Sequence, residues 1–184
     1  MTTTIVVLAV LVVLTAGFFA FLRWYQERGA RVITCPDNQE LAAVEVDAAH
    51  AAHTSIFRGT SKLQLSSCTR WPEKAGCDQA CLREVVDSPN HCLVRTILSD
   101  WYLGRNCVYC AKPIGEVNWH DHHPALYDPE QQMTLEWTDI PPEQVYAVLA
   151  THEPVCWNCH VAESFRREHP DLVTDRPDHR ATGA

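Results

Sequence analysis

Two Cys-x-x-Cys pairs that lie far apart in the sequence constrain the fold of this 184-residue chain more than any other feature. The first pair is Cys107 and Cys110, and the second is Cys156 and Cys159, followed directly by His160. A tetrahedral zinc ion binds four thiolates, and each Cys-x-x-Cys pair supplies one edge of such a tetrahedron. The spacing therefore predicts that two distant segments converge on one zinc ion.

The second pair also fits a different cofactor. Residues 156–160 have the Cys-x-x-Cys-His order to which c-type haem is attached. In that interpretation the two thiols bind haem covalently, His160 is one axial ligand, and Met133 or another histidine is the distal ligand. Haem would leave the first Cys pair without a role, so zinc is the preferred cofactor and haem c remains an alternative.

Four of the remaining cysteines predict a second metal centre. Two of them, Cys77 and Cys81, lie four residues apart in a segment with helical character (residues 76–86) and would share one helix face. Zinc is the default ion, and an iron–sulfur cluster is an alternative because four thiolates hold either. Cys92 is a substitute ligand, and burial as free thiols is the non-ligating alternative. The predicted ligands are Cys35, Cys68, Cys77 and Cys81.

The amino-terminal segment predicts a membrane anchor. Residues 5–22 are almost entirely Val, Leu, Ile, Ala and Phe, and about 20 helical residues of this kind cover the roughly 30 Å of hydrocarbon in a bilayer. A cleaved signal peptide is the alternative, and it has a basic start and a cleavage site between small residues. Residues 1–4 contain no basic side chain, and residues 23–26 read Arg-Trp-Tyr-Gln. We therefore expect an uncleaved anchor in the lipid bilayer.

Charge predicts the orientation of the anchor and argues against one class of partner. Arg23, Arg28 and Arg31 all follow the apolar run, so the positive-inside rule places the carboxyl-terminal part in the cytoplasm, where thiols stay reduced. With Glu27, these arginines give residues 1–31 a charge of +2, which leaves −10 for the remainder of a chain whose net charge is −8. An acidic domain is repelled by phosphate backbones, which disfavours nucleic acid as a partner.

The periodicity of the remaining sequence predicts an α+β domain that is small, Cys-rich and stabilised by metal. A hairpin is expected over 32–45 with Cys35 at its bend, and Ser and Pro predict a loop over 66–73. Helices are predicted over 48–57, 93–103, 142–150 and 156–169, and a strand over 133–137. The expected divisions are an anchor with its basic flank (1–31), a hairpin with helices and the first Cys cluster (32–104), a zinc-binding module (105–170) and a flexible tail (171–184).

Histidines supply further candidate ligands. His50 and His53 lie three residues apart on the helix predicted after Asp47, so they share a face, although exposed histidines without a metal are commoner. Residues 119–123 read Trp-His-Asp-His-His, and these side chains offer either ligands or a base, or they form a solvated loop.

Residues 105–169 resemble the treble-clef family of zinc-binding folds. In that family a turn bearing one Cys pair is followed by a helix whose first turn donates two more thiols, which implies a structural zinc ion on Cys107, Cys110, Cys156 and Cys159. Asp121-His122 and residues 156–160 also resemble, more distantly, the His-Asn-His (HNH) nucleases. That resemblance implies that His122 is the base that activates water. Thr151 stands where that family has asparagine, and the family's Gly-Gly is absent.

Together these features predict a membrane-anchored zinc-binding protein with a structural or interaction role, for example as an accessory subunit of a membrane complex. We find neither a nucleophile–base pair nor a phosphate-binding Gly-rich loop, so an enzyme is not the preferred interpretation. A haem-bearing electron carrier and a degenerate HNH nuclease remain the alternatives. The acidic surface and the loop Trp119–His123 are the predicted docking face for other membrane-complex proteins.

Overall fold

The computed structural model describes residues 2–58, 63–74, 76–119 and 124–172. Clustering of contacts divides the chain into two compact units, Met1–Leu93 and Val94–Ala184. Both units combine helices with a three-stranded antiparallel sheet, so the mixed α and β character expected from the sequence is confirmed. Each unit is described by itself.

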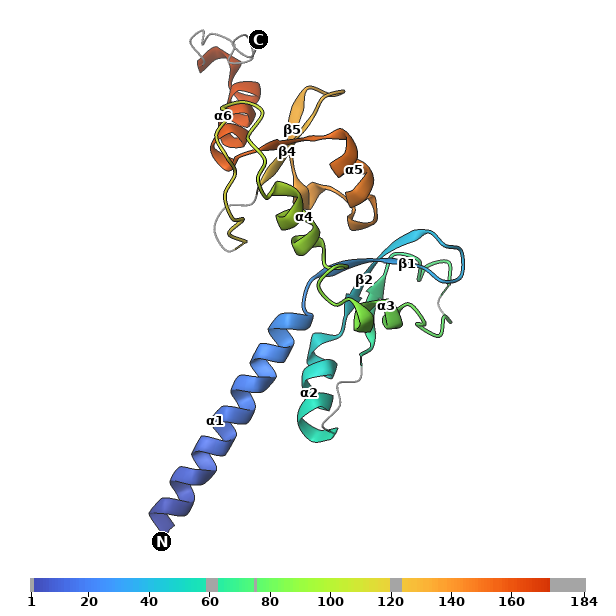
Figure 1. Cartoon of the computed structure of the whole chain (residues 1–184), viewed down its shortest axis with the longest axis vertical. Coiled ribbons are helices and arrows are strands. Elements are labelled where there is room, and N and C mark those ends of the chain that lie inside the picture. Colours follow the sequence, from blue (N-terminus) through green and yellow to red (C-terminus); the bar gives the residue numbers. More distant parts are fainter. Residues whose placement is uncertain (1, 59–62, 75, 120–123, 173–184) are drawn as a thin grey trace. The chain divides into compact units, whose positions relative to one another are not determined.

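The first unit begins with a long apolar helix, α1 (Thr2–Glu27) (Figure 1). Its segment Thr3–Leu22 has a mean hydropathy of 3.0, and none of the most apolar window is buried. By length and composition this helix is able to cross a membrane, and a signal sequence has the same properties.

The sheet of the first unit has the order β1-β2-β3, with strands β1 (Ala30–Thr34), β2 (Leu41–Val46) and β3 (Leu65–Cys68). β1 and β2 form the hairpin expected over 32–45, which is confirmed. The loop expected over 66–73 is wrong at its beginning, because Leu65–Cys68 pairs with β2. Ser66 and Ser67 suit an edge strand, because their hydroxyls bond to Glu45 and stay at the surface.

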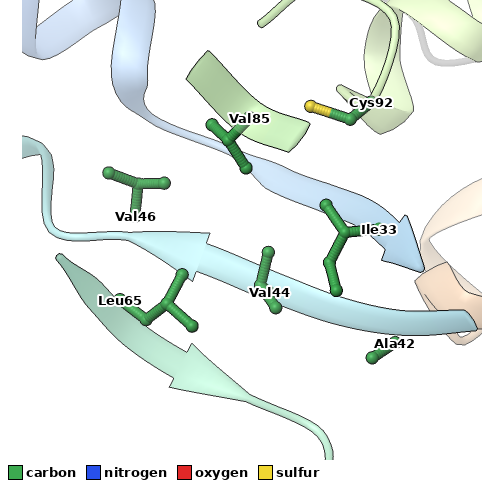
Figure 2. Close-up of a cluster of buried hydrophobic side chains, with 7 residues drawn as sticks. All are labelled: Ile33, Ala42, Val44, Val46, Leu65, Val85 and Cys92. Atoms are coloured by element: carbon green, nitrogen blue, oxygen red, sulfur yellow. The ribbon is translucent and has the colours of Figure 1, made fainter. Parts of the chain in front are cut away.

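The core of the first unit lies on one face of this sheet. Figure 2 shows Val85 and Cys92 over the face that carries Ile33 and Val44. Ile33 and Val44 are each 1% exposed, and both faces of β1 are covered, because Arg31, Val32 and Ile33 in its middle are all buried. The core is small and rich in cysteine, because Cys92 belongs to it and Cys35, Cys68 and Cys81 pack against it.

Two helices complete the first unit. α2 (Ala48–Arg58) contacts α1 and is capped as expected, because Asp47 Oδ1 accepts the backbone N–H of His50 at 2.8 Å. α3 (Leu82–Asp87) is shorter than predicted, since residues 76–81 are not helical and the helix begins only after Cys81. Gln79 interrupts the helix with φ +57°, and its side-chain Oε1 accepts the N–H of Leu65. The shared helix face predicted for the two cysteines flanking Gln79 is therefore wrong.

The second unit contains the sheet order β5-β4-β6, in which both pairs are antiparallel. The central strand β4 (Ala125–Asp128) is buried at all four positions, and the buried Tyr102 hydroxyl at the end of α4 (Val94–Tyr102) donates to the carbonyl oxygen of Ala125 at 2.7 Å.

The strand predicted over 133–137 and the helices predicted over 93–103, 142–150 and 156–169 are all present; β4 and β6 were not predicted. The elements are α4 (Val94–Tyr102), β4 (Ala125–Asp128), β5 (Met133–Glu136), 3₁₀ turns at Trp137–Asp139 and Pro142–Gln144, α5 (Val145–Thr151), β6 (Glu153–Val155), α6 (Trp157–Glu168) and a last 3₁₀ turn at Pro170–Leu172.

A buried ion pair joins the end of α1 to the first strand. Arg31 is 1% exposed and Glu27 is 5% exposed, and the guanidinium lies 3.1 Å from the Glu27 carboxylate. The same guanidinium donates to the Glu27 carbonyl oxygen at 2.6 Å. Removal of one partner from a buried pair leaves an uncompensated charge, which costs far more than loss of an exposed pair.

We therefore predict that Glu27→Ala destabilises the first unit by about 3–5 kcal/mol. Hydrogen exchange of β1 and β2 amides in the detergent-purified protein during urea unfolding measures this loss. The control is Glu73→Ala, because Glu73 is largely exposed and lies 3.8 Å from Arg70; it should cost less than about 1 kcal/mol. Equal effects of the two substitutions would contradict the prediction.

Candidate metal centre

The first Cys pair lies in a tight turn between Cys107 and Lys112. The N–H of Cys107 donates to the Lys112 carbonyl at 2.9 Å, and the N–H of Ala111 donates to the Cys107 carbonyl at 2.8 Å. Ala111 has φ +56°, a left-handed conformation that reverses the chain. This turn holds Cys107 fully buried while Cys110 remains partly accessible.

The second pair is placed by β6 and the start of α6. Cys156 is the N-cap residue of α6, and Cys159 lies in its first turn. The N–H of Cys156 donates to Cys107 Sγ at 3.3 Å, and the N–H of Val108 donates to the Pro154 carbonyl at 3.0 Å. The beginning of a helix carries partial positive charge, which partly offsets the cost of ionising thiols that are buried at this position.

The structure brings the two pairs together at the distance of a single ion. The four Sγ atoms lie within 4.8 Å of one another, and Cys110 Sγ is 3.8 Å from Cys156 Sγ. Zinc–sulfur bonds of about 2.3 Å in a tetrahedron separate the sulfurs by about 3.8 Å. Four soft thiolates at this separation fit zinc by ligand type and by geometry, and backbone N–H donors already surround one of them.

The thiols of this centre have perturbed pKa values. Burial alone would raise the pKa of Cys107, but hydrogen bonds from the backbone N–H groups of Cys156, Cys110 and Tyr109 outweigh it and lower the pKa. Burial raises the pKa of Cys156 and, together with neighbouring thiols, that of Cys159. Among these groups Cys107 is therefore the one whose anionic form the protein itself stabilises.

A small apolar cluster surrounds the four sulfurs. Ala125, Tyr127 and Val155 from the sheet are buried against Cys107, and the Tyr109 ring packs edge-on against Tyr127 with ring centroids 5.7 Å apart. This cluster contains few large aliphatic side chains, so a metal ion bound here would add substantially to the folding energy, as it does in zinc-finger peptides, where it contributes about 10 kcal/mol or more.

The His160 side chain contacts β5 and is not one of the four clustered metal-ligand candidates. It is 8% exposed, its Nδ1 lies 2.8 Å from Thr134 Oγ1, and its Nε2 lies 3.6 Å from Glu136 Oε1. Both ring nitrogens therefore face polar atoms of β5, whereas a haem iron needs one of them as an axial ligand. This arrangement and the proximity of the two Cys pairs favour the four-cysteine centre over haem.

Other predicted site residues do not join this centre in the part of the chain that the structure describes. His50 and His53 lie on α2, and neither belongs to a group of three or more ligand side chains at single-ion distance. Met133 begins β5. His122, the base implied by the HNH resemblance, lies with the rest of residues 120–123 outside the described residues. Trp119 is described, and its indole N–H donates to Ser99 Oγ at 3.0 Å.

The four cysteines predicted for a second centre line one pocket of the first unit: Cys35, Cys68, Cys77 and Cys81. No three of their Sγ atoms lie within 4.8 Å of one another, as the Sγ atoms of the second unit do. Burial, followed by the charges of Cys68 and Cys77, raises the pKa of Cys81 to about 11. A hydrogen bond from the backbone N–H of Asp37, helped by the Arg70 guanidinium and the N–H of Asn38, lowers the pKa of Cys35.

Arg70 is the functional candidate that the sequence analysis missed. Its guanidinium Nη1 donates to Cys35 Sγ at 3.3 Å, although the two residues are distant in sequence. No local sequence pattern indicated this contact, because Arg70 and Cys35 come from different segments of the chain.

Comparison of the chain with protein-family models, with curated proteins and with solved structures gives no match.

We predict that Cys159→Ser removes the zinc bound by the second unit, because three thiolates no longer complete the four-ligand set of a structural zinc site. Elemental analysis of the purified full chain measures the zinc, and hydrogen exchange of residues 107–112 measures the loss of order. Cys92→Ser is the control, because Cys92 lies in the core of the first unit and should leave this zinc in place. Zinc that persists at full occupancy in Cys159→Ser would contradict the four-cysteine site.

Proposed function

We propose that this chain is a membrane-anchored, zinc-stabilised interaction protein whose domains after α1 lie in the cytoplasm and serve as an accessory subunit of a membrane complex. The observation that carries the proposal is the convergence of Cys107, Cys110, Cys156 and Cys159, all within 4.8 Å. Four protein ligands close the coordination sphere of zinc and leave no position for substrate, which is typical of structural rather than catalytic sites.

The apolar helix supports the anchor in this proposal. α1 presents exposed Val, Leu and Phe side chains along Thr3–Leu22, and burial of such a surface in water-free lipid is favourable. Trp24 follows this segment, and the Arg28 guanidinium lies 4.7 Å from the centroid of its ring. An aromatic residue and cations at one end of an apolar helix suit the cytoplasmic membrane interface.

The second unit exposes an apolar surface on α6 that suits a protein partner. Val161 is 45% exposed and Phe165 is 47% exposed, and residues four apart share one face of a helix. α6 is also the helix whose first turn carries the second Cys pair. Zinc binding would therefore fix the helix that presents this apolar surface to a partner.

The topology is tested with reporters fused to the carboxyl terminus of the full chain. We expect the green fluorescent protein fusion to fluoresce in the membrane fraction, because this reporter matures in the cytoplasm. We expect the alkaline phosphatase fusion to be inactive, because this enzyme becomes active only after export. The chain should stay in the membrane after alkaline carbonate extraction without loss of mass. An active phosphatase fusion would reverse the orientation, and release of a shortened soluble chain would identify α1 as a signal peptide.

The docking surface is tested by photocrosslinking within intact membranes. A photoreactive amino acid at position 165 should give a discrete adduct with a membrane-complex protein, because this side chain would lie in the interface. The matched control is position 86, where Val86 is 62% exposed in the first unit. The same adducts from both positions, or none from position 165, would contradict an interaction through α6.

A further inference from the structure

A pocket of about 340 Å³ in the first unit is lined by four cysteines. Each comes from a different place in the fold: Cys35 follows β1, Cys68 ends β3, Cys77 lies in the loop after it, and Cys81 immediately precedes α3. Apolar side chains of Ile33, Ala42, Leu65 and Trp71 form other parts of the wall. This pocket goes beyond the function proposed above, which uses only the zinc centre of the second unit.

The turn that carries Cys35 has the same backbone construction as the turn that carries Cys107. The N–H of Cys35 donates to the Glu40 carbonyl at 2.8 Å, and the N–H of Gln39 donates to the Cys35 carbonyl at 2.8 Å. The corresponding bonds, Cys107 with Lys112 and Ala111 with Cys107, measure 2.9 and 2.8 Å. Gln39 has φ +59° where Ala111 has +56°. Cys35 is thus held like a residue of the zinc centre.

A third turn of this kind shows what the construction demands of its first residue. Gln132 has φ +54°, and Asp128 at the start of that turn accepts the N–H groups of Glu130 and Gln131 on Oδ1 at 2.8 and 3.2 Å. The second and third N–H groups after the first residue therefore point at an anionic acceptor, either carboxylate or thiolate. The turn alone does not identify a metal site. The three further cysteines around the same pocket do.

The sulfurs of this pocket are spaced more widely than those of the second unit, which favours a larger inorganic group over a single zinc ion. Tetrahedral zinc would bring the sulfurs to about 3.8 Å from one another, and among these four thiols no three lie within 4.8 Å of one another, as those of the second unit do. In an iron–sulfur cluster, inorganic sulfides separate the irons, so the four thiolates stand further apart around a space that the cluster fills. The pocket between these cysteines offers such a space.

We propose that Cys35, Cys68, Cys77 and Cys81 bind an iron–sulfur cluster in this pocket. A cluster with four thiolates is an anion, and Arg70 supplies a compensating cation whose Nη1 is 3.3 Å from Cys35 Sγ. Lys74 also lines the pocket and pairs with Asp37 at its edge. Hydrogen bonds to the sulfurs and a partly apolar wall are the features by which proteins stabilise such clusters.

Cys92 provides a matched control within the same unit. It is 4% exposed, belongs to the apolar core in Figure 2, and its Sγ lies 3.6 Å from the Pro89 carbonyl oxygen. It does not line the pocket. The cysteines of the first unit therefore separate into four that face the pocket and one that packs as a small apolar residue.

The decisive measurement uses the wild-type full chain in detergent, reconstituted without oxygen from ferrous iron and sulfide. We expect iron and acid-labile sulfide in equal amounts, with visible charge-transfer absorption that persists after desalting. Zinc in this pocket without acid-labile sulfide, or disulfides among the four cysteines in the protein as isolated under anaerobic conditions, would overturn the proposal. This measurement does not depend on the folding of any variant.

Variants assign the cluster to its ligands. Cys68→Ser and Cys81→Ser should lose most of the bound iron and sulfide, because four cysteine thiolates hold a cluster, whereas Cys92→Ser should retain both. Cys107→Ser should lose the zinc of the second unit and keep iron and sulfide, so failure of this proposal and failure of the zinc centre are separate outcomes. Equal retention of iron and sulfide in Cys68→Ser, Cys81→Ser and Cys92→Ser would overturn the assignment.

Discussion

The second unit is organised around four sulfur atoms that come from two distant parts of the chain and lie at the separation of a single ion. Its turn at Cys107 is tied to the segment from β6 to the start of α6 by hydrogen bonds from Cys156 N–H to Cys107 Sγ and from Val108 N–H to the Pro154 carbonyl. These bonds orient the thiols, and burial raises the pKa values of Cys156 and Cys159, so a cation that binds thiolates would offset the cost of ionising them. The sheet that connects the two segments is short, so a bound ion would supply the cohesion that a larger core provides elsewhere.

Much of this centre was predictable because its chemistry is local in sequence. A Cys-x-x-Cys spacing places two thiols on one turn of the chain. A pair at the start of a helix lies near the partial positive charge that every helix N-terminus carries. The elements with strong periodicity, α4, α5 and α6, were predicted for the same reason. The strands β4 and β6 were missed because their residues gain their role only by pairing with each other, and β6 is three residues long.

The errors concern residues whose conformation depends on distant partners. Cys77 and Cys81 have helical spacing, yet the left-handed Gln79 between them is held by a hydrogen bond to β3, which no local pattern reveals. Ser66 and Ser67 favour a loop by composition, but pairing with β2 makes them a strand edge. Arg70 acts on a thiol distant in sequence, so only the fold shows that contact. Tertiary contacts override local preference at these positions.

The ion pair between Glu27 and Arg31 has a mechanical consequence. Only Arg28, Gly29 and Ala30 separate the last residue of α1 from Arg31, and the pair spans that connection inside the protein. This pair restricts rotation between α1 and β1, so the helix and the sheet are expected to move together. If α1 anchors the chain in a bilayer and tilts as the bilayer thickness changes, the pocket beyond β1 would turn with it. Lipid composition would then influence the orientation of the first unit at the membrane surface.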